Sequence, residues 1–206
     1  PVEEDGDNVL QCRIPRGQGT QQKVVMHVGG HASTGSDGSA TTIDYMRPSV
    51  TGTQMLTPDL APGPAFWPTD GLHPTSRQPY RLRVSGDNFG IANRVVSLWR
   101  CDTAAVALSP TTQVCHDRAR LSLDACSAQA AVLGEPLSDG CLEGQAQNFD
   151  ELSFMHQLTS CDFTDTTATC DPPVGDGRAL FVVVSVTMVD GSMLHDNADD
   201  ATSSAR

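Results

Sequence analysis

Seven cysteines constrain this chain more than any other feature of its sequence. Six of them lie between residues 101 and 170, and none forms a C-x-x-C pair. This spacing favours disulfides made in an oxidising compartment over a metal site. The six are Cys101, Cys115, Cys126, Cys141, Cys161 and Cys170. We therefore expect an extracellular chain whose fold is supported by disulfides.

Pairs that are local in the sequence are the favoured connectivity. These pairs are Cys101–Cys115, Cys126–Cys141 and Cys161–Cys170. The seventh cysteine, Cys12, stands apart, and an odd number leaves at least one thiol without a partner in the chain. We expect Cys12 to bond to a cysteine upstream of this sequence or in another chain. The alternative is a buried free thiol, since cysteine is among the most buried residue types.

Composition excludes two classes of partner. The formal net charge is −12, Lys23 is the only lysine, and arginines form no basic cluster, so nucleic acid is not an expected partner. The longest apolar run, residues 179–184, is far shorter than the roughly 20 residues that span a bilayer. No membrane-spanning segment is expected.

An internal repeat organises the chain. Residues 12–19 and 170–177 both read C-x-x-P-x-G-x-G, and apolar residues alternate in the same register after each copy. Those residues are Val24, Met26 and Val28 in the first copy and Val182, Val184 and Val186 in the second. Alternation with period two predicts a strand with one buried face. A strand, a Pro/Gly turn and a second strand suggest a hairpin-like unit in each copy.

The chain between the two copies changes character twice. Residues 31–44 are a polar Gly/Ser/Thr loop that ends at Tyr45. Residues 47–79 carry seven prolines, too many for a helix or a central strand, and are interpreted as an extended, semi-rigid connector. Beyond the connector, residues 80–84 alternate apolar and arginine side chains and end in a Gly-Asp-Asn turn, and another strand is expected at 94–99.

These residues resemble a known family. The strand followed by Gly86-Asp87-Asn88-Phe89-Gly90, the later C-x-x-P-x-G-x-G turn and the valine strand after it are similar to the IPT/TIG domain. This immunoglobulin-like module is found in plexin-type receptors, in transcription factors and in repeat-bearing cell-surface proteins. The resemblance covers residues 80–101 and 161–191, and residues 9–46 as the second half of another copy. It implies an all-β, immunoglobulin-like β-sandwich with a disulfide-rich insertion and a Pro-rich connector.

The resemblance divides the chain into modules. Residues 1–46 would be the late-strand half of one module, and residues 80–192 a second module with an insertion at 102–160. An acidic tail at 193–206 would follow, since the family's last strand has no clear counterpart after Gly191. The sequence is then expected to be a piece of a secreted precursor. Alternatively, residues 1–46 pack on the second module as extra strands of one irregular sandwich.

The insertion carries most of the cysteines and weak helix signals. Residues 121–134 are rich in alanine and predict a short helix closed by Gly134, and Asn148 with Glu151 is typical of a helix start. No segment there is long enough for a core of its own, so disulfides are expected to hold it. Similar IPT domains link neighbouring strands, and the resemblance therefore also allows a Cys101–Cys170 bond.

The remaining motifs offer two candidate metal sites, neither of which is favoured. His27 and His31 have the spacing of helical metal ligands, but they end a strand and enter a Gly turn, so no metal site is predicted there. The acidic stretches could hold Ca²⁺, but neither matches an EF-hand loop and a solvated acidic surface is favoured. They contain Glu3, Glu4, Asp5 and Asp7, and Asp196, Asp199 and Asp200. No catalytic or cofactor-binding residue is predicted, and the protein is not expected to be an enzyme.

Two features suggest carbohydrate. Trp67, with Tyr80 and Trp99, could stack on a sugar, although strand aromatics normally pack in a core. The chain has no Asn-x-Ser/Thr sequon, so O-linked glycans on the Ser/Thr/Pro-rich segments at 33–42 and 48–79 are the form of glycosylation expected of a glycoprotein here.

The hypothesis that follows is a structural subunit or repeat of an extracellular filament or cell-surface appendage. A half-sandwich cannot bury its apolar face alone, so neighbouring copies of the chain would complete one another head-to-tail by adding strands. One alternative is an adhesion or receptor ectodomain that binds a glycan or protein ligand. Another is a non-catalytic accessory module of a carbohydrate-active enzyme.

Overall fold

A computed structural model gives the fold. It describes residues 3–4, 10–14, 17–19, 22–33, 41–64, 70–101, 112–158, 160–172, 180–187 and 193–195. The first strands are β1 (Glu3–Glu4), β2 (Leu10–Gln11), β3 (Gln22–Val24), β4 (His27–Val28), β5 (His31–Ala32), β6 (Thr41–Ile43) and β7 (Ser49–Leu56). They are followed by β8 (Arg81–Asp87), β9 (Arg94–Cys101), α1 (Thr112–Leu133) and α2 (Asp139–Ala146). The last strands are β10 (Leu152–Leu158), β11 (Cys161–Phe163), β12 (Thr167–Cys170), β13 (Leu180–Thr187) and β14 (Met193–His195).

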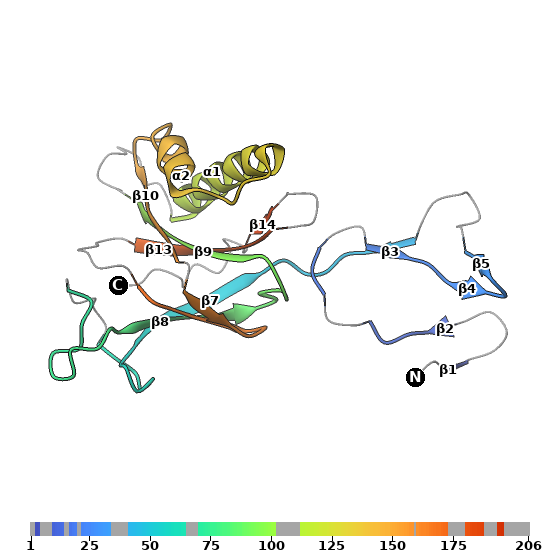
Figure 1. The fold of residues 1–206 in the computed structure, drawn as a ribbon, viewed down its shortest axis with the longest axis horizontal. Helices are drawn as coiled ribbons and strands as arrows, with labels where there is room; N and C mark the ends of the chain where they lie inside the picture. The colour runs from blue at the N-terminus through green and yellow to red at the C-terminus, as the bar shows by residue number, and fades with distance from the viewer. Residues whose placement is uncertain are drawn as a thin grey trace.

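The elements from β7 to β14 form a body of three layers. One sheet has the strand order β11-β12-β8-β7 and the other has the order β10-β9-β13-β14, with antiparallel neighbours throughout. Helices α1 and α2 cover the outer face of the second sheet, which therefore lies in the middle (Figure 1). Most of the regular structure is β, as expected, and the two sheets form a β-sandwich with an added helical layer.

The middle sheet is buried on both of its faces. Along β13, Phe181 and Val183 join the cluster under the helices, whereas Val182 and Val184 join the cluster between the two sheets. A strand covered on both sides reads as a continuous apolar run and does not alternate. This explains the run at 179–184, where the repeat by itself predicted only one buried face.

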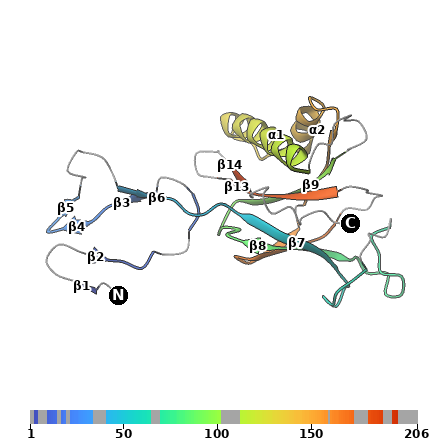
Figure 2. The ribbon, with the colours of Figure 1, turned by 180° about the vertical axis from the view of Figure 1, so that it is seen from behind.

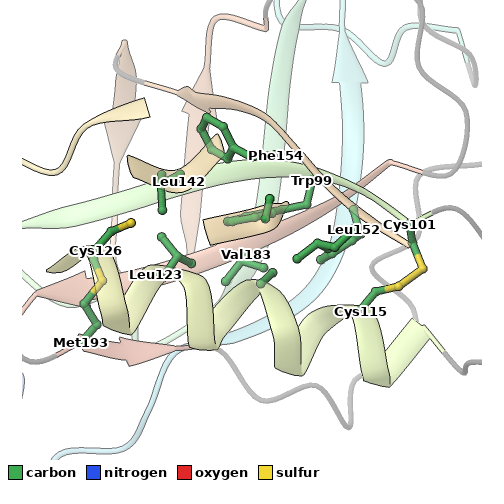
Figure 3. Packing of buried hydrophobic residues seen from close by; sticks show 13 residues of the cluster. Trp99, Cys101, Cys115, Leu123, Cys126, Leu142, Leu152, Phe154, Val183 and Met193 are labelled. Atoms are coloured by element: carbon green, nitrogen blue, oxygen red, sulfur yellow. A yellow bond between two sulfur atoms is a disulfide. The ribbon is translucent and has the colours of Figure 1, made fainter. Parts of the chain in front are cut away.

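The cluster under the helices is built from α1, α2 and the strands of the middle sheet, with α1 contributing the most residues (Figure 3). Trp99 is fully buried there, 5.1 Å from the ring of Phe154, and its indole Nε1 donates to Ser97 Oγ at 2.8 Å. The Ser97 hydroxyl in turn donates to the Val183 carbonyl at 3.3 Å. Each polar group of this pair is thus hydrogen-bonded inside the core, as burial requires.

Helix α1 is longer than the sequence predicted. Residues 121–134 were expected to be helical, and the C-terminal end agrees, since Gly134 takes a φ of 68° beyond the last turn. The helix begins at Thr112 because its buried face starts earlier: Cys115, Ala119, Leu123 and Cys126 recur at spacings of four, four and three. Neither helix in the described part of the chain is long and apolar enough to cross a membrane.

The predicted helix start at Asn148 is wrong. Residues 147–151 form turns that lead into β10, and the capped helix is α2, where the Ser138 hydroxyl accepts from the Cys141 N–H at 3.3 Å. Glu151, expected to cap a helix, is buried and forms an ion pair with Arg118. Its carboxylate is therefore engaged by helix α1.

Three boundaries from the sequence analysis need correction. The connector at 47–79 begins with an eight-residue strand, β7, which lies at the edge of a sheet; Pro48 and Pro58 flank it, so the high proline content of the segment concealed a proline-free stretch. The insertion at 102–160 ends in β10, which pairs with β9. The tail at 193–206 begins with the buried strand β14, which pairs with β13, while residues 196–206 lie outside the described part.

Strands β1 to β6 form an arm that extends to one side of the body (Figures 1 and 2). They make three two-stranded sheets, β1-β2, β3-β6 and β4-β5, and none of these strands pairs with a described strand of the body. In the described residues, then, the arm does not add strands to the sandwich, in contrast to the alternative that treated residues 1–46 as part of it.

Candidate functional site

The two copies of the C-x-x-P-x-G-x-G motif occupy the same place in the strand order. In the body, β12 ends at Cys170 and pairs with β11, and the next strand, β13, belongs to the other sheet. In the arm, β2 precedes Cys12 and pairs with β1, and the next strand, β3, pairs with β6. Each motif thus joins strands of different sheets, so the expected hairpin-like unit is wrong.

The offset between the copies is 158 residues, the separation of Cys12 and Cys170. Strand β3 begins at Gln22 and β13 begins at Leu180, the same offset. The arm therefore repeats the second half of the body's strand sequence, beginning with a hairpin, then the motif, then an apolar strand. Within the described residues it has no counterpart of β8 and β9.

The consequence is seen in the burial of equivalent side chains. Val182 and Val184 are 2% and 0% exposed, whereas their equivalents Val24 and Met26 are 47% and 44% exposed. In the body, β13 lies between β9 and β14, whereas β3 has β6 as its one described neighbour. The apolar residues that follow the motif are therefore buried in the body and exposed in the arm.

The arm is joined to the body through the motif itself. The side-chain oxygen of Gln18 accepts from the backbone N–H groups of Ile91 and Ala92 at 2.8 and 3.0 Å. Gly90, with φ at 73°, lets this oxygen approach, since a Cβ there would lie 2.5 Å from it. Two backbone donors on one acceptor define the direction in which the arm leaves the body.

Tyr45 reinforces this junction. Its backbone N–H donates to the Gly19 carbonyl at 2.8 Å, and its ring covers Gly17, where a Cβ would lie 2.4 Å from Cζ. A pocket of about 220 Å³ lies between arm and body. Its lining residues are Gly17, Tyr45, Asp87, Asn88, Gly90, Ile91, Asp165 and Thr166.

The disulfides have the local connectivity that the spacing favoured. Bonds join Cys101 to Cys115, Cys126 to Cys141 and Cys161 to Cys170. Cys170 is thus bonded within its own hairpin and not to Cys101, the pairing that the resemblance also allowed. Three disulfides indicate a protein of an oxidising, extracytoplasmic compartment.

Cys12 carries a free thiol and is exposed, so the buried-thiol alternative is wrong. The repeat explains why it has no partner in its own hairpin. Cys170 bonds to Cys161, and the residue 158 positions before Cys161 is Glu3. Its exposure leaves the thiol accessible, and a bond to another chain or to an upstream cysteine stays a prediction.

A Ser–His–Asp arrangement emerges that the sequence did not reveal. The Ser185 hydroxyl lies 2.7 Å from His195 Nδ1, and His195 Nε2 lies 3.0 Å from Asp124 Oδ1. It joins strand β13, strand β14 and helix α1. Ser185 has no exposed surface and Asp124 is about half exposed, the reverse of a hydrolase, in which substrate must reach the serine. This chain of hydrogen bonds ties the helix to the sheet.

Two histidines, His116 on α1 and His195 on β14, are held in their neutral form. Burial, helped by the nearby Arg120 charge, lowers the pKa of His116 to about 4, and its ring lies 4.4 Å from that of Phe181. Burial also lowers the pKa of His195, against the opposing effect of Asp124, with Arg120 and Arg47 adding to the lowering. Charging either histidine opposes the packing of the helical layer.

Of the remaining residues singled out from the sequence, the two histidines lie within the described part of the chain, whereas Trp67 and several acidic residues do not. His27 and His31 begin β4 and β5, which are joined by a turn in which Gly29 and Gly30 both have positive φ, so the expected glycine turn is present although neither histidine ends a strand. Among the described residues no three His, Cys, Asp or Glu side chains gather to hold a metal. Trp67, Asp5, Asp7, Asp196, Asp199 and Asp200 lie outside the described residues.

Tyr80 and Trp99 are buried in the body, at 4% and 0% exposure. This agrees with core packing and excludes the two as an exposed sugar-stacking platform.

Comparison with known proteins adds no relative: no family model, no curated protein and no solved structure matches the chain. The open face of the arm and its junction with the body are therefore the site on which a function can be argued.

Proposed function

We propose that this chain is a structural subunit or repeat of an extracellular filament or cell-surface appendage. Its modules are immunoglobulin-like, of the IPT/TIG type, and join head-to-tail by strand complementation. The observation that carries the proposal is the exposure of Val24 and Met26, whose equivalents Val182 and Val184 are buried. An edge strand with an apolar face exposed to water invites pairing with another strand.

The geometry of the arm supports an open chain of modules. Strands β1 to β6 extend away from one side of the body and do not lie against its two sheets (Figure 2), and Val24 and Met26 of this arm are exposed. A contact between the arm of one copy and a different surface of the next is heterologous. Heterologous contacts that do not close into a ring build filaments.

The experiment compares the assembly of the chain with that of an arm variant. Sedimentation velocity and negative-stain electron microscopy of the purified chain are expected to show elongated oligomers. Replacing Val24 and Met26 with aspartate puts two charges on the open face and is expected to reduce the oligomers to single chains, since buried unpaired charge is strongly unfavourable.

The matched control is Val132→Asp. Val132 is also apolar and is 87% exposed, but it lies on α1 in the body. This variant is expected to assemble like the unmodified chain. Single chains at all concentrations, with slow amide exchange throughout β3 and β6, would contradict the proposal, because the arm would then be complete by itself.

A further inference from the structure

The repeat indicates which type of strand would pair with β3 and cover the apolar residues of the arm. Resting on the proposed function, we propose that the edge of β3 that has no neighbour among the described residues binds an antiparallel strand of the β9 type, delivered together with a β8-type strand by a neighbouring module. The second copy of the repeat shows what this partner looks like. There, β13 is covered by β9, and β12 is paired with β8.

The register follows from the body. Strand β13 places Val182 opposite Leu98, Val183 opposite Ser97 and Val184 opposite Val96. Moved back by the repeat offset, Val24 lies opposite a leucine-like residue, Val25 opposite a small polar one and Met26 opposite a valine-like one. A one-residue slip would turn the partner's apolar residues away from this face, so the register is well determined.

The hairpin of the arm indicates the charge of the partner's other strand. In the body, Arg81 on β8 donates to Asp162 on β11 at 3.0 Å. The residue 158 positions before Asp162 is Glu4, on strand β1. Glu4 thus matches an arginine at the start of an incoming β8-type strand, whereas Arg13, the equivalent of the second partner of Arg81, Asp171, does not.

The β9 strand of a folded body cannot serve as this partner. It is paired with β10 on one edge and with β13 on the other, so it has no edge to offer. In an assembly of copies, the donor is therefore the β8–β9 pair of a neighbouring copy whose β13 has been displaced from β9, and β3 takes the place of β13. The partner therefore consists of two extended segments. One carries arginine beside alternating apolar residues, and the other carries the valine–serine–leucine alternation of β9.

The test supplies such a donor to the whole chain. A second copy of residues 80–100 is joined in front of residue 1 through a flexible Gly/Ser linker of about 15 residues, enough to let the donor reach the arm. We expect the amides of residues 22–28 to exchange on the order of 100-fold more slowly than in the unextended chain. The extension omits Cys101, so it brings no additional thiol.

The matched control carries the same extension with Val96→Asn and Leu98→Asn in the added copy only. It keeps the length, the linker and the arginines but removes the apolar side chains that face Val24 and Met26. We expect no slowing of exchange in this control. Equal exchange rates in the two extended chains would overturn the inference. Equally fast exchange would show that the edge of β3 does not bind the added strand, and equally slow exchange would show that it binds any strand.

This result is separable from that of the assembly experiment. A chain that stays single but gains protection from the added copy would overturn head-to-tail assembly and support the identity of the strand. A chain that forms filaments but gains no protection would leave assembly standing and overturn the β9-type partner.

Discussion

Two buried histidines held in their neutral form, His116 on α1 and His195 on β14, make the body sensitive to acid. The pKa of His116 lies at about 4 in the folded chain, below the ordinary value of 6.5. Between these two values the unfolded chain binds the proton and the folded chain does not, so the free energy of unfolding falls as the pH falls. Above 6.5 both states are neutral and the effect is absent.

Replacing His116 with leucine should flatten this dependence. Between pH 7 and pH 4.5 the unmodified chain is expected to lose about 2 kcal/mol more stability than His116→Leu, as a shift of that size implies. Urea denaturation at the two pH values measures the difference. His31→Leu, at an exposed histidine, should keep the full dependence, and the same slope in His116→Leu would show that other groups are responsible.

At the scale of elements, the disulfide between Cys126 and Cys141 joins the two helices to each other. Helix α2 has only eight residues, too few to be stable by itself, so it depends on this bond and on the burial of Leu142 and Ala146. The helical layer is thus held to the middle sheet by packing and by the Cys101–Cys115 bond between β9 and α1, and its two helices are joined to each other by the Cys126–Cys141 bond.

Removing that bond has a predictable effect. The double variant Cys126→Ala with Cys141→Ala is expected to lower the free energy of unfolding by about 2–4 kcal/mol, chiefly by freeing the unfolded chain. Guanidinium denaturation followed by circular dichroism measures it. Cys12→Ala, at the exposed free thiol, should change stability by less than about 0.5 kcal/mol. Equal losses in the two variants would show that the bond does not support the helices.

Local signals in the sequence predicted some elements well and others poorly. The strand at 80–84 was visible because inward apolar and outward arginine residues alternate there, and a second strand was expected at 94–99 after the Gly-Asp-Asn turn; β8 and β9 agree with both. Helix α1 was recognised only over its alanine-rich half. Its first half buries Cys115 and Ala119, small residues interspersed with charged ones, and composition gives these little weight.

Elements whose burial depends on distant partners could not be predicted. Strand β14 is three residues long, and its place is set by pairing with β13 and by the His195 hydrogen bonds. The Ser185–His195–Asp124 arrangement joins three elements separated along the chain, so no local motif could reveal it. The repeat, in contrast, was visible from residue types alone, and it identified the open arm.

At the scale of the whole molecule, Gln18 fixes the arm to the body. Gln18→Ala removes the acceptor for the Ile91 and Ala92 amides, and we expect these two amides to exchange on the order of tenfold faster. Small-angle scattering should show a broader distribution of distances. Global stability should change by less than about 0.5 kcal/mol, since the core is untouched.

Gln54→Ala, on the exposed edge strand β7, is the control for this substitution and should leave both measurements unchanged. An unaltered scattering profile and unaltered exchange in Gln18→Ala would show that Tyr45 and the chain connection alone orient the arm.

The short span of the disulfides bears on how such a chain would respond to pulling. The three bonds enclose sequence separations of 14, 15 and 9 residues, and none connects the two sheets of the sandwich. Under tension along its length, the sheets of a module can slide apart while each local loop stays closed. A fibre of these modules would therefore lengthen by unfolding one module at a time, and the closed loops would limit how far each one extends.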